Sequence, residues 1–348
     1  MYIIKEWFER QFNNPQVVIL SVLLLLGFGT VYFLGRILLP FFAGLVIAYL
    51  LDGVVKQFTK RGVPRFLAVL ISFIIFMLIL IFIIFWVVPL LTRQVTQLVQ
   101  QLPGMISEAQ YMLLKLPEEY PRFISEDQVS EIFSGIRREV GRLAQKILSI
   151  SVASVVGIIT LLVYLIIVPL LVFFFLKDRD KIISWFTAFL PSDLSLAVQV
   201  WEDVNIQIAN YIRGKTWEII IVWVVTFMVF TLFNLQYAIL LGAIVGFSVL
   251  IPYVGAAVAT LPVALVAYFQ WGFGSEFIWI LIAYAIIQML DGNVLAPLLL
   301  AEVVDIHPVG VIASILIFGG LWGFWGVFFA IPLATLVQAI IKAWPNVQ

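Results

Sequence analysis

The sequence contains no cysteine and only one histidine. The absence of cysteine excludes disulfide bonds, thiol catalysis and thiolate metal sites. A single histidine is too few for the two-histidine helix of a zinc peptidase. The RGKT stretch at 213–216 resembles a phosphate loop, but Ala209 stands where that motif requires its first glycine. The sequence therefore predicts no enzyme, no metal site and no cofactor.

Positive charge is missing from the last third of the chain. No Lys or Arg occurs from Thr216 to Ile341. The same stretch contains five acids, which are Glu218, Glu276, Asp291, Glu302 and Asp305. An acidic side chain at bilayer depth costs about 2.5–3.5 kcal/mol, so these groups must face protein, water or the membrane interface. We expect no fixed cation in this region to pair with them.

Charge is scarce in the whole sequence. Charged residues make up 11% of it and hydrophobic residues 63%, with a mean hydropathy of +1.12. Soluble domains contain about 45–50% apolar residues, so this composition indicates a membrane protein. The 20 Lys and Arg balance the 20 Asp and Glu, and nothing in the sequence predicts a nucleic-acid partner.

The hydrophobic residues fall into segments long enough to cross a bilayer. About 20 apolar residues span the hydrocarbon core as a helix. On this measure the sequence predicts eight segments, near 17–34, 37–53, 66–91, 150–176, 216–235, 238–269, 277–298 and 309–341. The fold class is therefore all-α, a polytopic transmembrane protein. LIPYVGA (250–256) and GGLWGFWG (319–326) predict broken or re-entrant helices in the C-terminal third.

The segments and the charges between them suggest a domain organisation. We predict N-terminal transmembrane helices (1–91), an extracytoplasmic amphipathic helical cap (92–149), a transmembrane helix (150–176), a cytoplasmic interfacial region (177–215) and a transport core (216–348). Lys and Arg cluster before the first segment, at 56–65 and at 177–215. By the positive-inside rule these clusters and both termini are cytoplasmic.

Asp291 is the leading candidate for a functional residue. It ends a run of 14 uncharged residues and precedes Gly292 and Asn293. One interpretation is an unwound polar stretch that lines a cavity, with Asp291 as a proton or cation acceptor and Asn293 as a hydrogen-bonding partner of the substrate. The other is that a short helix ends there and an interfacial loop begins. Both remain open for Asp291.

Other residues of this region have weaker claims. An interfacial loop is the favoured interpretation for Glu302 and Asp305. His307 could shuttle protons, but a histidine before Pro308 is more typical of a helix entry. The transport-path candidates are Asp291, Gly292, Asn293, Pro297, Glu302, Asp305, His307, Pro252 and Gly255. The candidates for helix breaks or close packing are Gly242, Gly246, Gly319, Gly320, Gly323 and Pro332.

Several strings resemble a known family. They are LPFFAGLVIAYLLDGVV (39–55), VPLLVFFFLKDRD (168–180), YIRGK (211–215), YAILLGAIVGFSVLIPYVGA (237–256), DGNVLAPLLL (291–300) and IHPVGVIASILIFGGLWGFWGVFFAIPLA (306–334). Together they resemble the autoinducer-2 exporter-like (AI-2E) family, and the final third is most similar to its PerM-like permease subgroup. The resemblance implies a homo-oligomeric, pentameric permease of the bacterial inner membrane. Some members export autoinducer-2, and others are linked to sodium/proton antiport.

These observations lead to one main functional hypothesis. We expect a secondary transporter that sits in the lipid bilayer and exports a small polar metabolite or an autoinducer-2-like signal, coupled to protons or sodium. The alternatives are a passive cation-selective channel lined by the unpaired acids and a non-transporting oligomeric scaffold.

Overall fold

The structure is a computed structural model that describes residues 15–35, 37–114, 126–151, 155–189, 195–252, 254–300 and 306–343. These residues form helices joined by turns, and none of them lies in a strand. The helices are α2 (Pro15–Leu34), α3 (Leu39–Lys60), α4 (Arg65–Phe82), η1 (Ile83–Val87), α5 (Val88–Leu113), α7 (Glu126–Ser151), α8 (Val155–Lys177), α9 (Arg179–Thr187), α10 (Ser195–Leu232), α11 (Ala238–Ser248), α12 (Val254–Trp271), α13 (Ser275–Leu290), η2 (Asp291–Leu295), α14 (Ala296–Leu300), α15 (Pro308–Trp322), α16 (Phe324–Phe328) and α17 (Ala330–Ala343).

The predicted fold class is confirmed. Among the described residues, six helices are long and apolar enough to cross a membrane, and a seventh is obtained if α8 and the bent α9 form one span. Their outer surfaces carry many exposed leucine, isoleucine and phenylalanine side chains, which a lipid environment accommodates. The predicted eighth segment, 309–341, is divided among α15, α16 and α17, and none of these reaches 18 residues.

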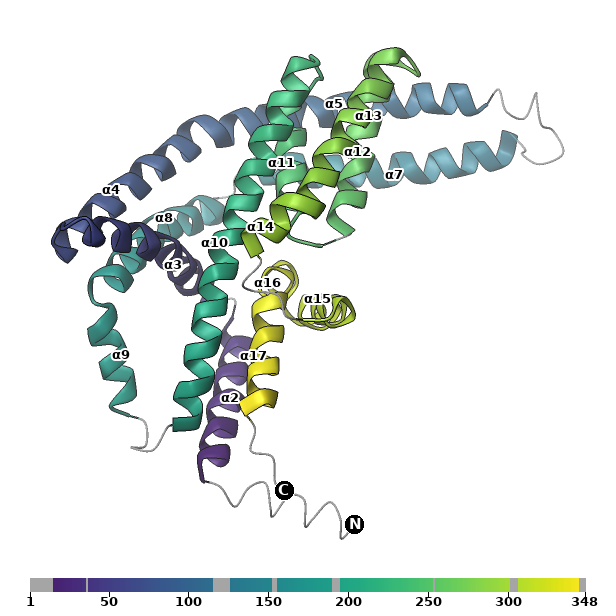
Figure 1. The fold of residues 1–348 in the computed structure, drawn as a ribbon. Coiled ribbons are helices and arrows are strands. Elements are labelled where there is room, and N and C mark those ends of the chain that lie inside the picture. Colours follow the sequence, from purple (N-terminus) through teal and green to yellow (C-terminus); the bar gives the residue numbers. More distant parts are fainter. Residues whose placement is uncertain are drawn as a thin grey trace, which may run out of the picture.

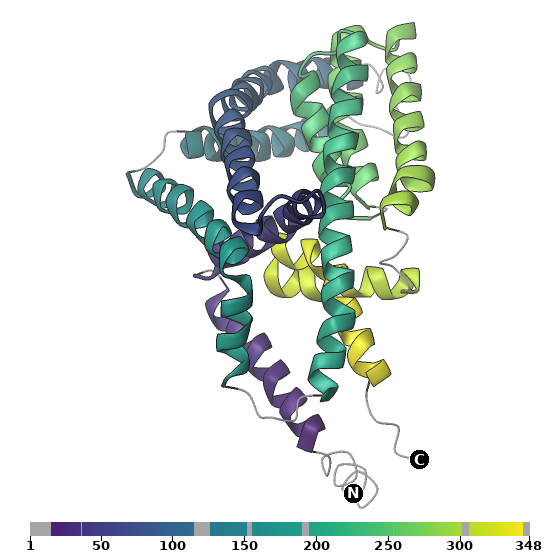
Figure 2. The ribbon, with the colours of Figure 1, turned by 60° about the vertical axis from the view of Figure 1, so that its left-hand side comes forward.

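The longest helix organises the molecule. α10 contains 38 residues, a length of about 57 Å at 1.5 Å per residue. It runs through most of the molecule's height, with α2 and α17 beside its first half and α11, α12 and α13 at its other end (Figures 1 and 2). The start of α2 and the end of α17 therefore lie at the same end of the molecule.

Two hydrophobic clusters hold α10 in place. Val200 and Val204 in its first half are buried against Val17 of α2 and Ala339 of α17. In its second half Phe230 is fully buried among residues of α11, α12 and α13. Both ends of α10 are thus fixed by apolar contacts, which leaves its middle in the centre of the protein.

This course of α10 changes the expected organisation. The boundary predicted at 215 falls in the middle of α10, so Arg213 and Lys215 belong to one continuous helix with the apolar residues that follow them. The polar residues of 195–210 lower the local hydropathy, which is why the sequence places a boundary inside the helix. The boundary predicted at 91 likewise falls inside one helical run of 49 residues, from Arg65 to Leu113.

The amphipathic helices predicted within 92–149 are present. α5 and α7 contact each other and lie side by side across one end of the molecule (Figure 1). Val99 of α5 and Phe133 of α7 are the buried residues of this pair. The segment between these two helices, 115–125, lies outside the described residues.

Two of the predicted helix breaks are confirmed. α11 ends at Ser248 and α12 begins at Val254, and Gly255 packs so closely on the Ser248 carbonyl that a Cβ would overlap it. The other break is at Gly323, whose φ of +60° reverses the chain between α15 and α16. Gly326 then rests directly on the Phe318 carbonyl. Gly255 and Gly326 are needed because a Cβ has no space there, and Gly323 is favoured because its positive φ is strained for a residue with a side chain.

The other small residues have separate roles. A Cβ added to Gly319 would lie 2.9 Å from Val327 Cγ2 of α16. A Cβ added to Gly320 would have no neighbour within 4 Å, so this position does not require glycine for close packing. Pro332 lies in the first turn of α17, where its missing N–H leaves no hydrogen bond unmade.

The GxxxG spacing at Gly242 and Gly246 lies where α11 packs closely against α10. A Cβ on Gly246 would lie 2.7 Å from the Cβ of Trp223 and 2.9 Å from the Ile219 carbonyl oxygen. A Cβ on Gly242 would lie 3.1 Å from the Phe227 nitrogen. The two glycines therefore let α11 approach the backbone of α10, as the packing interpretation predicts.

This contact gives a stability prediction. Gly246→Ala should destabilise the protein by about 1–3 kcal/mol, because the methyl group forces α10 and α11 apart. The measurement is the midpoint of thermal unfolding of the detergent-solubilised protein, followed by tryptophan fluorescence. Gly29→Ala in α2, where nothing lies within 4 Å, is the control and should not lower the midpoint. Equal midpoints for the two variants would contradict the assignment.

Candidate functional site

Asp291 is buried in the centre of the protein. It is the first residue of η2, it is 9% exposed, and its Oδ1 atom has no hydrogen-bond partner among the described residues. The helix end or interfacial loop that the sequence leaves open is therefore excluded for Asp291. A buried carboxylate with a free oxygen is costly unless a cation or a proton compensates it.

The compensating charge comes from α10. Lys215 Nζ donates hydrogen bonds to Glu218 Oε1 at 3.0 Å and to Oε2 at 2.9 Å, and both side chains are 3% exposed. Asp291 lies within electrostatic range of both of them. The expectation that no fixed cation serves the acidic region is therefore wrong, because Lys215, one residue before the region, is folded into it.

These three residues form a cluster with unequal charges, which we call the buried triad (Lys215, Glu218 and Asp291). One lysine faces two carboxylates, so the cluster carries a net charge of −1 when all three groups are ionised. Lys215 and Glu218 stand three residues apart and so share one face of α10. Glu218 uses both oxygens on Lys215, whereas Oδ1 of Asp291 remains free. The triad can therefore accept one further positive charge at Asp291.

A close backbone contact brings α10 and the Asp291 segment together. Gly214 packs on the Leu299 carbonyl of α14, where an added Cβ would lie 2.5 Å from the oxygen. η2 and α14 both contact α10. A larger residue at 214 would push α14 away, so Gly214 keeps Lys215 and Asp291 close to each other.

The backbone at Asp291 differs from the predicted unwound stretch. The chain from Ser275 to Leu300 stays helical and widens into a π turn at Asp291–Leu295. Such single π turns inside α-helices are often found at functional sites. The unwound stretch considered for Asp291 is therefore absent, because the chain stays helical through the π turn and continues to Leu300.

The neighbours of Asp291 in the sequence do not share its site. Gly292, Asn293 and Pro297 are exposed on the other faces of the same helical run. Asn293 donates its Nδ2 hydrogen to the Met289 carbonyl at 2.8 Å, within its own helix. The structure thus brings Asp291 together with α10 and leaves these three candidates outside the triad.

The remaining candidates lie elsewhere. His307 is the N-cap of α15, and its Nδ1 accepts a hydrogen bond from the Val309 N–H at 3.3 Å, which supports the helix-entry interpretation. Pro252 lies in the turn between α11 and α12, and Gly255 lies in the first turn of α12. Glu302 and Asp305 lie outside the described residues. Among the described residues, no group of three or more His, Cys, Asp or Glu could hold a metal ion.

Lys215 is a site residue that the sequence pattern did not reveal. Its place after Arg213 and next to an apolar stretch matches an ordinary positive flank of a transmembrane helix. The three-residue spacing of Lys215 and Glu218 was the available signal, since it is the spacing of an intrahelical ion pair. That signal becomes informative only when α10 is known to be continuous through residue 215.

Sequence comparisons agree on one family. The AI-2E family transporter model matches residues 20–346. PerM of Escherichia coli (strain K12), named as a permease, is 43% identical over 343 residues, which cover 99% of this chain and 97% of PerM. YueF of Bacillus subtilis (strain 168), named as a transport protein, is 27% identical over 89% of this chain and 84% of its own. TqsA of E. coli (strain K12), named as an AI-2 transport protein, is 22% identical over 95% and 92%.

The triad leads to a prediction about stability. Lys215→Met should destabilise the protein by about 3–5 kcal/mol, because two buried carboxylates then lack a cation. Adding Glu218→Gln should restore much of this loss, since one of the two charges is removed. Thermal unfolding of the single and double variants measures both effects.

A matched control is available on α9. Lys181 also pairs with an acid three residues away, Asp178, but its side chain is 85% exposed. Lys181→Met should leave the unfolding midpoint nearly unchanged, because exposed ion pairs contribute little. If Lys215→Met were as mild as this control, the triad would not be an isolated buried cluster.

Proposed function

This chain belongs to the AI-2E family of transporters, and on that premise we propose that it exports a small polar metabolite or signalling molecule in exchange for protons or sodium. It is a multi-pass membrane protein whose relatives are named as permeases and transport proteins, not as enzymes. Direction, substrate and coupling ion are the parts that the proposal adds to the family assignment.

The observation that carries the proposal is the free oxygen of Asp291 in the buried triad. Ionisable groups inside membrane segments are costly and are typical of ion and substrate pathways. A structural ion pair needs one cation and one anion, which Lys215 and Glu218 already provide. The additional carboxylate has no structural partner of its own, so a function is the better explanation for it.

The charge of the triad suggests how coupling works. With Asp291 ionised, the cluster carries a net negative charge that is costly to enclose in a low-dielectric interior. A proton or a sodium ion at Asp291 makes the cluster neutral. A conformation that closes the site to water is therefore favoured when the ion is bound, and one that admits water is favoured when it is absent. This difference links the gradient to the conformational cycle.

The mobile parts of this cycle would be the irregular helices around the triad. The turn between α11 and α12, the π turn η2 and the reversal at Gly323 interrupt regular hydrogen bonding. Interrupted helices line the binding sites of many secondary transporters. We propose that the route runs through 237–334, now extended to include the middle of α10.

A polar substrate fits this family context. TqsA is named for the transport of AI-2, and a small, polar signalling molecule of that kind is our lead substrate class. We further propose that the protein sits in a bacterial inner membrane with both termini on the cytoplasmic side. We also propose that it forms a homo-oligomer, with five subunits suggested by the family resemblance.

The two alternatives lose some of their basis. A cation-selective channel was suggested by acids without a cation, and Lys215 now stands among them. The scaffold hypothesis does not explain why a charged triad is buried so far from any surface. A saturable, gradient-driven flux would separate the carrier from both alternatives.

The proposal predicts the effect of one isosteric change. Asp291→Asn should abolish gradient-dependent flux and leave the protein folded, because the amide keeps the shape of the side chain but cannot gain or lose a proton. The measurement is flux of labelled autoinducer-2 and a panel of polar metabolites into proteoliposomes with an imposed pH or sodium gradient.

Glu276→Gln provides the matched control. Glu276 is an exposed acid at the start of α13, in the same helical run as Asp291, and its replacement should retain wild-type flux. Full activity of Asp291→Asn would overturn the coupling role. Absence of gradient-dependent flux for every solute tested, from folded wild-type protein, would overturn the carrier assignment itself.

A further inference from the structure

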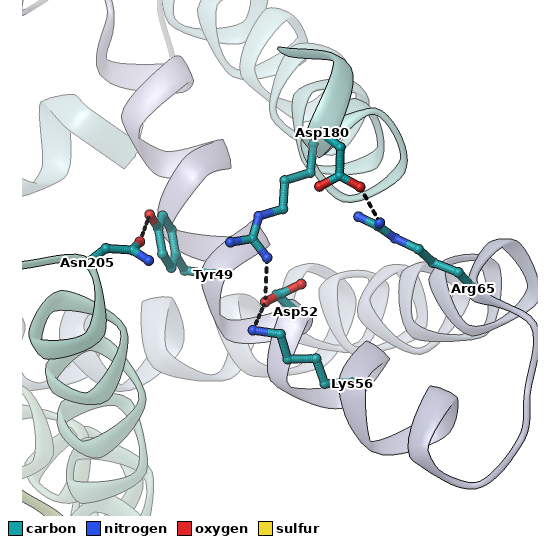
Figure 3. Close-up of polar contacts among 7 residues, drawn as sticks. Tyr49, Asp52, Lys56, Arg65, Asp180 and Asn205 are labelled. Carbon is teal, nitrogen blue, oxygen red and sulfur yellow. Dashed lines mark hydrogen bonds and ion pairs between the residues drawn. The ribbon is translucent and has the colours of Figure 1, made fainter. Parts of the chain in front are cut away.

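Two segments far apart in the sequence meet at one corner of the molecule. The turn between α3 and α4 lies next to the bend between α8 and α9. Asp52 accepts hydrogen bonds or ion pairs from Lys56 at 2.9 Å and from Arg179 at 3.4 Å, and Arg65 pairs with Asp180 (Figure 3). These pairs fasten the start of α9 to α3 and α4.

This corner carries an excess of positive charge. Residues 52–65 and 177–189 together contain seven basic and three acidic residues, a net charge of +4. The basic residues are Lys56, Lys60, Arg61, Arg65, Lys177, Arg179 and Lys181. Each of the three acids has a basic partner in the corner. Lys60 and Arg61 are exposed and pair with no carboxylate among the described residues.

α9 and the turn that follows it add an exposed aromatic surface beside these charges. Trp185, Phe186 and Phe189 are 60%, 57% and 72% exposed. The Trp185 ring lies 4.9 Å from the Phe186 ring and 5.0 Å from the Phe189 ring. With Ile182 they recur at the spacing of one helix face. No other described element covers this face.

The direction of α9 decides which partner this surface fits. α9 is bent by 81° from α8, an apolar helix that qualifies as a span only together with α9. The bend turns α9 away from the axis of α8 and leaves its aromatic face uncovered. A helix in this position with aromatic residues on one face and basic residues near it is typical of interfacial membrane binding.

We propose that this surface, the elbow patch (the α3–α4 turn, residues 177–181 and the aromatic face of α9), binds the headgroups of anionic phospholipids. The rings of Trp185, Phe186 and Phe189 enter the headgroup region. Lys60 and Arg61, which pair with no carboxylate in the described part of the chain, attract the lipid phosphates. An acidic protein would complement the charges but not the exposed rings, so a lipid surface is the better fit to both. The proposal is independent of the transport function.

The first experiment measures lipid selectivity. Full-length protein is reconstituted into phosphatidylcholine bilayers containing spin-labelled phosphatidylglycerol or spin-labelled phosphatidylcholine, and the protein-associated fraction of each label is determined by electron paramagnetic resonance. The Lys60→Gln, Arg61→Gln double variant should reduce the preference for phosphatidylglycerol by about threefold or more, since each basic residue near the surface contributes substantially to anionic lipid attraction. High salt should reduce the wild-type preference in the same way.

The control removes the same charge elsewhere. Arg137→Gln with Arg138→Gln takes two exposed basic residues from α7, far from the elbow patch in the sequence, and should leave the preference unchanged. An equal loss in both double variants would show a general charge effect and overturn the proposal. An unchanged preference in the Lys60 and Arg61 variant would overturn it as well.

The second experiment tests the position of α9. Because the chain contains no cysteine, a single introduced cysteine gives one labelling site. A fluorophore attached at Phe189→Cys should be quenched by lipid nitroxides placed near the headgroups. A fluorophore at Ser184→Cys, on the opposite face of α9, should be quenched mainly by aqueous iodide. Equal iodide quenching at both positions would place α9 away from the membrane and overturn the proposal.

Discussion

The structure depends on a buried ion pair in the middle of a long helix, with a second carboxylate enclosed within electrostatic range of it. Burying charges costs several kcal/mol for each ion unless geometry and hydrogen bonds compensate. Lys215 and Glu218 meet this condition within one helix turn. Asp291 meets it only in part, because it lies on another helix within electrostatic range of Lys215, and its Oδ1 atom has no hydrogen-bond partner among the described residues. The packing around α10 can be understood as the arrangement that keeps this cluster enclosed.

Several local features follow from that requirement. Gly214 allows α14 to touch α10, and Gly242 and Gly246 allow α11 to touch it on another side. The π turn η2 starts at Asp291. These are places where small residues or irregular backbone bring chain segments closer than ordinary side chains permit. Gly214 and η2 are adjacent to triad residues in the chain, so a motion of α14 or η2 changes the environment of the same three charges.

The elbow patch also contains ion pairs, but these are exposed to solvent and not buried. Its ion pairs are exposed to a large extent, with 50% and 71% exposure for Arg65 and Asp180, so water screens them and they contribute little to stability. Their effect is to orient α9. The buried triad instead gains from a low dielectric and is sensitive to every added charge. Charge thus orients a helix at the surface of the protein, whereas in its interior charge forms an ion pair beside an additional carboxylate.

The class of protein, most of the helices and the family could be predicted from the amino acids alone. Long apolar runs can only be helices in a bilayer, because the backbone must satisfy its own hydrogen bonds there. Gly323 and Gly255 were found because turns and close contacts need residues without a side chain. The sequence also indicated Asp291, since an acid after a long apolar run is costly at bilayer depth. The neighbours of Asp291, by contrast, depend on how distant segments fold together. Hydropathy places a boundary at 215, inside α10. It cannot assign Lys215 to the protein interior, because a lysine at a helix end and a lysine in a buried pair have the same local sequence. The contact of α14 with Gly214 is what distinguishes them, and it joins segments that are more than 80 residues apart.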